Sequence, residues 1–369
     1  MAAPTPDASW WNITEAVKRS GPVDLSKPYE TASLAGKSIL ITGGASGFGA
    51  AFARKWASHG AHVFLADVND AAGEAIVAEL RELPGSSKHH YYQHCDVTKW
   101  EDQVALFKKA VESSPTGGID AVIVNAGVVE KESAVTGKGF ENPAGLDEDH
   151  PAPPSLAVLN VNLTGAMYTT HLALFWLPRN GARPDGTPRD RHIVLTSSIA
   201  GLSPLPGQPE YTAAKHALVG LFRSLRGSVW RQGIRCNLIA PYFVATPLIP
   251  SRALLFSAGG DLAAIDDVVD ATTRLVADES IRGRGLAIGP KLKAVANADG
   301  DLELVAPEDD LRGYVGKIGS QAVWDVHAED YERVDLFVWR FVGALNLVVK
   351  IKGFVGLVKA VFAIFTSSK

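Results

Sequence analysis

Cysteine is scarce in this sequence. Only Cys95 and Cys236 occur in 369 residues, and both lie in apolar runs. Two cysteines are too few for the disulfide framework of a secreted domain, so we expect both to be reduced core residues. The N-terminus lacks the apolar stretch of a signal peptide, and a net charge of −4 offers no basic surface for nucleic acid. We therefore expect a cytoplasmic protein without nucleic-acid partners. We also expect no metal site.

The C-terminal segment is strongly apolar but contains no uncharged run long enough to span a bilayer. Its longest such run, 341–349, has nine residues, whereas a spanning helix needs about 20. Apolar residues recur there at helical spacing, namely Phe337, Phe341, Leu345 and Val348. Three lysines are interspersed: Lys350, Lys352 and Lys359. We expect a helix that covers the core or a partner subunit, with peripheral membrane contact secondary.

Short apolar strands alternate with amphipathic helices from Ser38 onward. Strand patterns occur at 38–42, 62–67, 89–97, 121–127, 192–198, 234–241 and 285–295. This alternation predicts a parallel sheet covered by helices on both faces. The expected fold is therefore α/β, a doubly wound Rossmann fold with a parallel sheet of about seven strands and with ligands at the carboxyl ends of the strands.

Three regions are expected along the chain: an N-terminal extension at 1–36, a Rossmann-fold dehydrogenase domain at 37–304 and an apolar helical extension at 305–369. The first contains a short helix pattern at 14–20 and should pack across the outside of the core. Two connections are long for loops. The connection at 130–155 follows a strand, so it should rim the active site. The connection at 178–190 precedes a strand, on the opposite edge, and is expected to be decoration.

A glycine-rich motif, TGGASGFG at Thr42–Gly49, stands between the first strand and a helix pattern. In this context Gly43 permits a tight turn, Gly47 lets the backbone approach a pyrophosphate, and Gly49 lets helix and strand pack closely. The free N–H groups at the start of the helix then form an anion site. The motif predicts binding of a dinucleotide.

Asp67 ends the second strand, 24 residues after Gly43. A carboxylate at this position accepts hydrogen bonds from the ribose hydroxyls of adenosine and repels a 2′-phosphate. No basic residue follows it directly, and the glycine loop has Ala45 and Ser46 instead of a basic residue. These features favour NAD over NADP.

Four motifs in this order resemble the short-chain dehydrogenase/reductase family: the glycine loop, Cys95–Val97, VNAG at Val124–Gly127, and YTAAK at Tyr211–Lys215. The resemblance covers about residues 36–292. The sequence around YTAAK is most similar to the branch that contains 15-hydroxyprostaglandin dehydrogenase. The family implies that the cofactor lies against the following residues: Gly43, Ser46, Gly47, Phe48, Gly49, Asp67, Asp96, Val97, Asn125, Ala126, Gly127, Tyr211, Lys215, Pro241, Val244 and Thr246. Tyr242 departs from the pattern, because the family usually has glycine there.

Tyr211 and Lys215 are four residues apart in a helix pattern, so both project from one face. A tyrosine base needs its pKa lowered from about 10, and a nearby ammonium and the positive charge of the oxidised nicotinamide shift it in that direction. The resemblance adds Ser198 to hold the substrate oxygen, with Ser197 as the alternative. It also adds Asn162, with Asn160 as the alternative, and Gln208 as a substrate contact.

We expect an NAD-dependent oxidoreductase that interconverts a secondary alcohol and a ketone by hydride transfer, with Tyr211 as general acid/base. Family members commonly pair through the helices that hold Asn162 and Tyr211, which predicts a homodimer or homotetramer. Two alternatives are an NADPH-dependent ketoreductase of the same fold and a non-redox scaffold or binding protein that uses its tail for assembly. Asp67 disfavours the first alternative, and the complete Ser, Tyr, Lys and Asn set disfavours the second.

Overall fold

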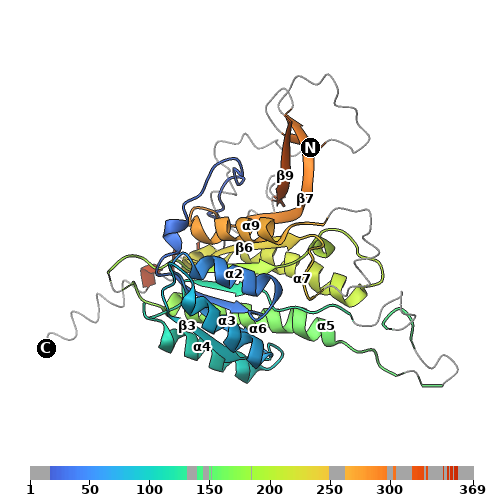
Figure 1. Cartoon of the computed structure of the whole chain (residues 1–369), viewed down its shortest axis with the longest axis horizontal. Coiled ribbons are helices and arrows are strands. Elements are labelled where there is room, and N and C mark those ends of the chain that lie inside the picture. Colours follow the sequence, from blue (N-terminus) through green and yellow to red (C-terminus); the bar gives the residue numbers. More distant parts are fainter. Residues whose placement is uncertain are drawn as a thin grey trace. The chain divides into compact units, whose positions relative to one another are not determined.

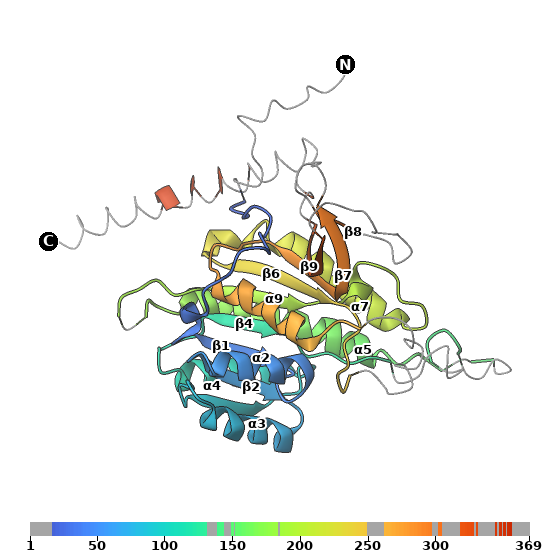
Figure 2. The same ribbon diagram turned by 45° about the horizontal axis from the view of Figure 1, so that its top comes forward.

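Seven parallel strands form the centre of the structure, in the order β3-β2-β1-β4-β5-β6-β7 (Figures 1 and 2). Their bounds are β1 (Ser38–Thr42), β2 (His62–Asp67), β3 (His90–His94), β4 (Ala121–Val124), β5 (His192–Thr196), β6 (Arg235–Pro241) and β7 (Gly285–Ala296). The order reverses between β1 and β4, which is where doubly wound sheets bind ligands. The predicted α/β fold with about seven parallel strands is confirmed.

The computed structural model describes residues 17–130, 139–143, 149–150, 152–183, 185–248, 262–296, 302–304, 318–327, 330, 344, 347–348, 350–351 and 353–355. The chain divides into two units, one formed by Val17–Val326 and the other by Met1–Ala16 with His327–Lys369. The expected connection at 130–155 is described only in part, and Phe337, Phe341, Leu345, Lys352 and Lys359 lie outside the described residues.

Helices cover both faces of the sheet because successive strand residues point to opposite sides. Ile39 and Ile41 belong to a core cluster with α2 (Gly47–Ala57), α3 (Asp70–Glu82) and α9 (Ile265–Ala277). Leu40 belongs to a second cluster with α4 (Trp100–Ser113), α6 (Ala166–Trp176) and α7 (Pro209–Leu225). Short helical turns complete the connections: η1 (Thr31–Leu34), α5 (Ala157–Leu159), η3 (Asn160–Gly165), η4 (Leu177–Arg179), η5 (Ile199–Gly201) and η6 (Val229–Gln232).

Both cysteines are free and buried in the second cluster, as predicted. Burial raises the pKa of the Cys95 thiol to about 12, with the neighbouring carboxylates acting in the same direction. Burial also raises the pKa of Cys236 to about 12. Thiols with such pKa values carry almost no thiolate at neutral pH, so they act as small apolar side chains.

The described part of the N-terminal extension packs against the core, as expected. Val17 is buried, and the Tyr29 hydroxyl donates to Asp270 Oδ1 on α9 at 2.7 Å. Arg274 of the same helix donates to the Lys27 carbonyl at 2.8 Å. The helix expected at 14–20 is not formed over 17–20, which makes a turn followed by residues without regular secondary structure, and 14–16 lie outside the described residues.

Two antiparallel strands were not predicted. Both β8 (Leu302–Leu304) and β9 (Ile318–Val326) pair with β7, and β9 follows β7 along most of its length (Figure 1). Asp325 of β9 accepts from the guanidinium of Arg284 at 2.6 Å, next to the start of β7. A strand of the sheet therefore lies within 305–369, the segment that the sequence assigned to a helical extension.

The described pieces of the far C-terminus are helical and exposed. Leu347, Ile351 and Phe354 have exposed fractions of 58%, 53% and 66%. They are three or four residues apart, so they share one helix face. Among the described residues, no helix combines the length and the apolar character needed to cross a bilayer.

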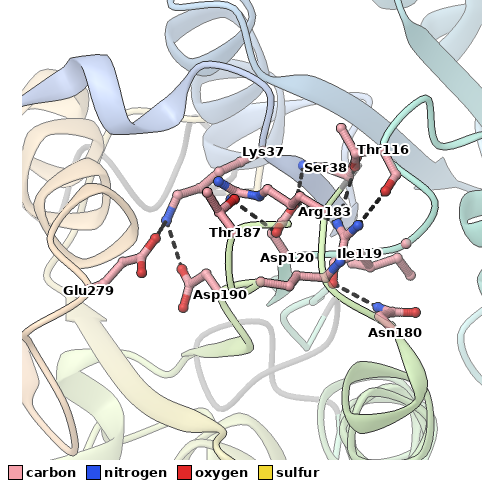
Figure 3. Close-up of polar contacts among 12 residues, drawn as sticks. Lys37, Ser38, Thr116, Ile119, Asp120, Asn180, Arg183, Thr187, Asp190 and Glu279 are labelled. Carbon is pink, nitrogen blue, oxygen red and sulfur yellow. Dashed lines mark hydrogen bonds and ion pairs between the residues drawn. The ribbon is translucent and has the colours of Figure 1, made fainter. Parts of the chain in front are cut away.

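Charged side chains are buried at the amino ends of the parallel strands (Figure 3). The Asp190 carboxylate accepts from Lys37 Nζ at 2.8 Å and from two guanidinium nitrogens of Arg235, also at 2.8 Å. These three side chains have exposed fractions of only 4%, 0% and 3%. Lys37 also binds Glu279 at 2.8 Å, but the Glu279 side chain is 50% exposed. Asp190 is therefore the buried anion between two buried cations.

The connection at 178–190 supplies much of this charge, so its interpretation as decoration is wrong. Asp120, just before β4, accepts from the Ser38 N–H at 2.8 Å and from Arg189 and Arg183 at 3.2 and 3.1 Å (Figure 3). The two arginines come from the connection itself, and so does Asp190. The polar turn-forming sequence of the connection gave no indication of this, because its partners lie before other strands.

Candidate active site

The glycine loop joins β1 to α2 in a conformation that needs glycine. Gly43 has φ +66°, and a Cβ atom there would lie 2.8 Å from the Ala126 backbone. A Cβ atom on Gly49 would lie 2.2 Å from the Gly43 carbonyl oxygen. Ser46 precedes α2 without capping it through its side chain, and it is exposed. The first turn of α2 thus offers backbone N–H groups beside a close-packed loop, which is an anion-binding arrangement.

Asn125 ties β4 to the glycine loop. Its side-chain amide donates to the carbonyls of Thr42 and Gly43 at 3.0 and 3.1 Å. The Thr42 hydroxyl in turn accepts from the backbone N–H groups of Asn125 and Ala126 at 3.1 and 3.2 Å. The VNAG motif therefore holds the two strands together at the point where the strand order reverses.

Asp67 lies at the carboxyl end of β2, directly beside the glycine loop. Its carboxylate accepts from the Ala45 N–H at 3.0 Å and from the Asn69 N–H at 3.1 Å. The next residue, Val68, is 60% exposed. The carboxylate is thus held in place by backbone groups and is partly open to solvent, with no basic side chain adjacent in the chain.

Asp96 and Val97 follow β3. The Asp96 carboxylate accepts from the Thr98 N–H at 3.0 Å and the Thr98 hydroxyl at 2.7 Å, and these bonds outweigh burial and hold its pKa below the usual value. Val97 is buried. On α2, Phe48 is half-buried and packs against the first core cluster. The structure thus places all these residues, which we expect to contact the cofactor, near the carboxyl ends of the parallel strands.

Ser198, Tyr211 and Lys215 come together between the end of β5 and the first turns of α7. All three are buried, and the Lys215 ammonium lies 5.5 Å from the centre of the Tyr211 ring. The ammonium donates to the Thr196 carbonyl at 2.9 Å. The Ser198 hydroxyl donates to the Pro241 carbonyl at 3.3 Å, and its presence near the phenol counteracts part of the rise in the pKa of Tyr211. By contrast, the Ser197 hydroxyl donates to the Lys215 carbonyl at 2.9 Å, so of the two candidate serines only Ser198 interacts with the phenol.

Burial acts on both ionisable groups of this trio. It raises the pKa of Tyr211, and the Ser198 hydroxyl opposes that rise. It lowers the pKa of Lys215 to about 8. In the protein alone the pKa of Tyr211 is thus raised, because the interior disfavours a phenolate more than its neighbours stabilise it. The lowered pKa expected from the sequence includes the positive charge of the oxidised nicotinamide, so it stays a prediction.

Asn162 lies in η3, a wide turn with the hydrogen-bonding period of a π-helix. Such turns occur mostly as single insertions within α-helices, often at functional sites. The Asn162 side chain accepts from the Val128 N–H and donates to the Val128 carbonyl, both at 2.8 Å. A Cβ atom on Gly127 would lie 3.3 Å from Asn162 Oδ1 and 3.7 Å from Lys215 Nζ. Asn162 thus belongs to the same centre as Lys215, while the alternative, Asn160, is exposed.

The loop after β6 lies over the glycine loop. A Cβ atom on Gly47 would lie 3.8 Å from Thr246 Cβ, and Val244 is buried. Tyr242, which stands where the family usually has glycine, has no positive φ and keeps its ring 38% exposed. Its N–H donates to the Ile288 carbonyl at 2.7 Å. The side chain is therefore accommodated without backbone strain.

Gln208 and a residue missed from the sequence, Glu130, meet at the start of α7. The side-chain amide of Gln208 is paired with the backbone of Glu130, accepting from its N–H at 3.0 Å. The Glu130 carboxylate accepts from the Glu210 N–H at 3.1 Å. Nothing in the local sequence indicates this role, because the two partners are 80 residues apart.

Several known proteins are similar to this chain in sequence or in fold. The model of the family described as short chain dehydrogenase matches residues 37–253. The 5'-hydroxyaverantin dehydrogenase of Emericella nidulans is 38% identical over 284 residues, covering 73% of this chain and 89% of that protein. The enzyme of the same name from Dothistroma septosporum is also 38% identical, over 276 residues, covering 72% and 89%.

A solved structure of 3-ketoacyl-(acyl-carrier-protein) reductase from Brucella melitensis, complexed with NADH, is similar over 69% of this chain and 97% of that chain. The two are 25% identical, with a TM-score of 0.56. The family model alone spans more than half of the sequence, and it includes the glycine loop, VNAG and YTAAK. The chain therefore belongs to the short-chain dehydrogenase family and is an oxidoreductase that acts on CH–OH groups.

Proposed function

We propose that this protein is an NAD-dependent oxidoreductase that interconverts a secondary alcohol and a ketone, with Tyr211 as general acid/base. The observation that carries the proposal is the buried trio of Ser198, Tyr211 and Lys215, with the Lys215 ammonium 5.5 Å from the Tyr211 ring. The relatives named 5'-hydroxyaverantin dehydrogenase support oxidation of an alcohol as the reaction class.

The residues around the glycine loop fit a nicotinamide dinucleotide. Any side chain in place of Gly47 would reduce the space between the glycine loop and Thr246. The N–H groups at the start of α2 favour a pyrophosphate there. The Asp67 carboxylate would accept the ribose hydroxyls and repel a 2′-phosphate, which supports NAD over NADP. Pro241, Val244 and Thr246 would hold the nicotinamide end. When bound, the cofactor supplies the carbon that accepts or donates the hydride.

Tyr211 would move the proton of the substrate hydroxyl. Lowering a tyrosine pKa from near 10 to near 7 corresponds to about 4 kcal/mol. Burial acts against this change, so positive charge must supply it, and the Lys215 ammonium lies 5.5 Å from the Tyr211 ring. Ser198 would hold the substrate oxygen, since it is buried beside the phenol and acts on its pKa. Asn162 holds the backbone beside Lys215 and would keep the ammonium in place.

The assembly, the branch and the location of the protein are further parts of the proposal. We infer a homodimer or homotetramer because apolar side chains of α6 and its neighbour α4 are open to solvent: Met167, Phe175 and Trp100 are 50%, 45% and 38% exposed. We propose a cytoplasmic enzyme of the 15-hydroxyprostaglandin dehydrogenase-like branch, with Gln208 near the substrate. We propose a division into an N-terminal extension at 1–36, a dehydrogenase domain at 37–304 whose sheet also takes up β9, and a C-terminal extension beyond β9 within 305–369. The tail would contact protein first and a membrane surface second.

The decisive test is Tyr211→Phe. The variant should bind NAD with unchanged affinity but lose turnover, because phenylalanine keeps the ring and removes the proton carrier. NADH formation from a panel of secondary alcohols measures the rate, and calorimetry measures NAD binding. Tyr168→Phe on α6, whose ring packs against Trp100, is the matched control and should retain activity. If Tyr211→Phe retains more than a few per cent of wild-type turnover, that is, a rate above roughly 10⁻² of the wild-type rate, Tyr211 is not the general acid/base.

A further inference from the structure

The first turn of α7, which carries Tyr211, is capped from another part of the chain. Helix starts leave backbone N–H groups without partners in the helix. Gln208, at the position before the helix, makes no side-chain hydrogen bond to the first turn, and Pro209 has no N–H to satisfy. Glu130 fills this place: its carboxylate accepts from the Glu210 N–H at 3.1 Å and from the Tyr211 N–H at 3.5 Å. The cap is therefore a carboxylate from the loop after β4.

A second pair of contacts joins the same two segments. The Glu130 N–H donates to Gln208 Oε1 at 3.0 Å, and Gln208 Nε2 approaches the Glu130 carbonyl at 3.5 Å. Each residue thus uses its side chain to hold the other segment. A negative charge at a helix start also interacts favourably with the helix dipole.

Glu130 also follows directly on the segment that surrounds Lys215. Gly127 lies against the Lys215 ammonium, and Val128 is bonded through its backbone to Asn162. Four residues of one loop, 127–130, therefore contact the groups around Lys215 at one end and the start of the Tyr211 helix at the other. Burial raises the pKa of Glu130, and the carboxylates of Glu210 and Glu141 act in the same direction, while the two backbone N–H groups lower it.

We propose that Glu130 is a positioning residue, whose carboxylate fixes the first turn of α7 and thereby sets the phenol of Tyr211 relative to Ser198 and Lys215. This inference rests on the proposed role of Tyr211 as general acid/base. Glu130 does not touch the reacting atoms in this account. It acts through the backbone of Tyr211, so its loss should slow the chemical step more than it weakens cofactor binding.

The test compares Glu130→Ala and Glu130→Gln in the full-length protein. Small displacements of a catalytic group cost up to about a hundredfold in rate, so Glu130→Ala should lower kcat by about ten- to a hundredfold, while the dissociation constant for NAD changes by less than about twofold. Glu130→Gln keeps one oxygen acceptor for the Glu210 N–H, so its kcat should lie between those of wild type and Glu130→Ala. Glu112→Ala, an exposed glutamate on α4, is the control and should behave as wild type.

Stability is measured in parallel by thermal unfolding, so that rates are compared only below the transition of each variant. Wild-type kcat in Glu130→Ala overturns the inference, and so does a Glu130→Gln rate as low as that of Glu130→Ala. A loss of NAD affinity equal to the loss of kcat also overturns it, because a general loosening of the fold would have that effect. Tyr211→Phe separates the two hypotheses. If it stays active, the proposed function fails; if it is inactive while Glu130→Ala is fully active, only the positioning role fails.

Discussion

Replacing Asp190 by asparagine should destabilise the protein by about 3 to 5 kcal/mol, the range for removing one partner of a buried ion pair. The change keeps the shape of the side chain and removes its charge. Lys37 and Arg235 would then be buried cations without the anion that lies 2.8 Å from each. Lys37 would retain Glu279, and Arg235 would retain backbone carbonyls such as that of Val276. These remaining partners place the expected loss at the lower end of the range.

The matched control is Glu279→Gln, which removes the other carboxylate on the same lysine. Glu279 binds Lys37 at the same distance, 2.8 Å, but its side chain is 50% exposed while that of Asp190 is 4% exposed. An exposed ion pair contributes about 0 to 1 kcal/mol. The two variants therefore differ in burial far more than in geometry, and their difference measures what burial adds.

Urea unfolding at neutral pH, followed by fluorescence and circular dichroism, gives the free energies of unfolding. Thermal transitions should fall by roughly 6 to 10 °C for Asp190→Asn, at about 2 °C per kcal/mol for a domain of this size. Activity below the transition should be unchanged, because Asp190 lies at the amino ends of the strands and the trio around Tyr211 at the opposite ends. If Asp190→Asn is as stable as Glu279→Gln, the reasoning from burial is refuted.

The pH dependence gives an independent check. Burial acts to raise the pKa of Asp190, but Arg235 and Lys37 outweigh it and hold the pKa below the usual value. A lowered folded-state pKa means that the stabilisation is complete above the unfolded value of about 3.9 and is lost as the pH falls from there through the folded-state value. The stability difference between wild type and Asp190→Asn should therefore be constant from neutral pH to about pH 5 and shrink below about pH 4.

Two further predictions concern the cofactor and the tail. NAD should be preferred over NADP by well over tenfold in kcat/KM, where tenfold corresponds to about 1.4 kcal/mol, because the Asp67 carboxylate repels a 2′-phosphate. Asp67→Ala should reduce this preference. Equal kcat/KM values for the two cofactors in the wild type would contradict the assignment. The full chain should have the mass of a dimer or tetramer by light scattering. Truncation before Asp335 should change that mass or make the protein insoluble, since we propose that the apolar tail covers protein. Unchanged mass, with only the full chain sedimenting with anionic vesicles, would favour the membrane instead.

The fold and the centre of the site were predictable because their signals are local in the sequence. The glycine loop combines a strand, a turn that requires Gly43 and a helix within a few residues, and Tyr211 and Lys215 are one helical turn apart. Their grouping with Ser198 and Asn162 came from the order of family motifs. The structure brings these four side chains together. It adds that burial raises the pKa of Tyr211 in the protein alone, which the sequence could not indicate because burial depends on the whole fold.

The features that were missed depend on contacts between distant segments. Asp190 in a polar connection resembles a solvated residue until Lys37 and Arg235 are brought to it from the starts of other strands. Glu130 caps a helix that begins about 80 residues later, so no spacing rule could find it. The strand β9, which pairs with β7, was missed because the prediction for 305–369 was based only on the apolar helix pattern of that segment.

Because η3 is a wide turn, the structure of the segment Asn160–Gly165 depends on its number of residues more than on which side chains it carries. Each residue of an α-helix advances the chain by about 100° around the axis. Deleting one residue from Asn160–Gly165 would let the turn relax into an α-helix and would rotate the preceding residues against α6 by about that angle. Asn162 would then leave Val128, to which it is bonded at both ends of its amide. Homologues should therefore vary the side chains on the outside of this turn while keeping its number of residues fixed.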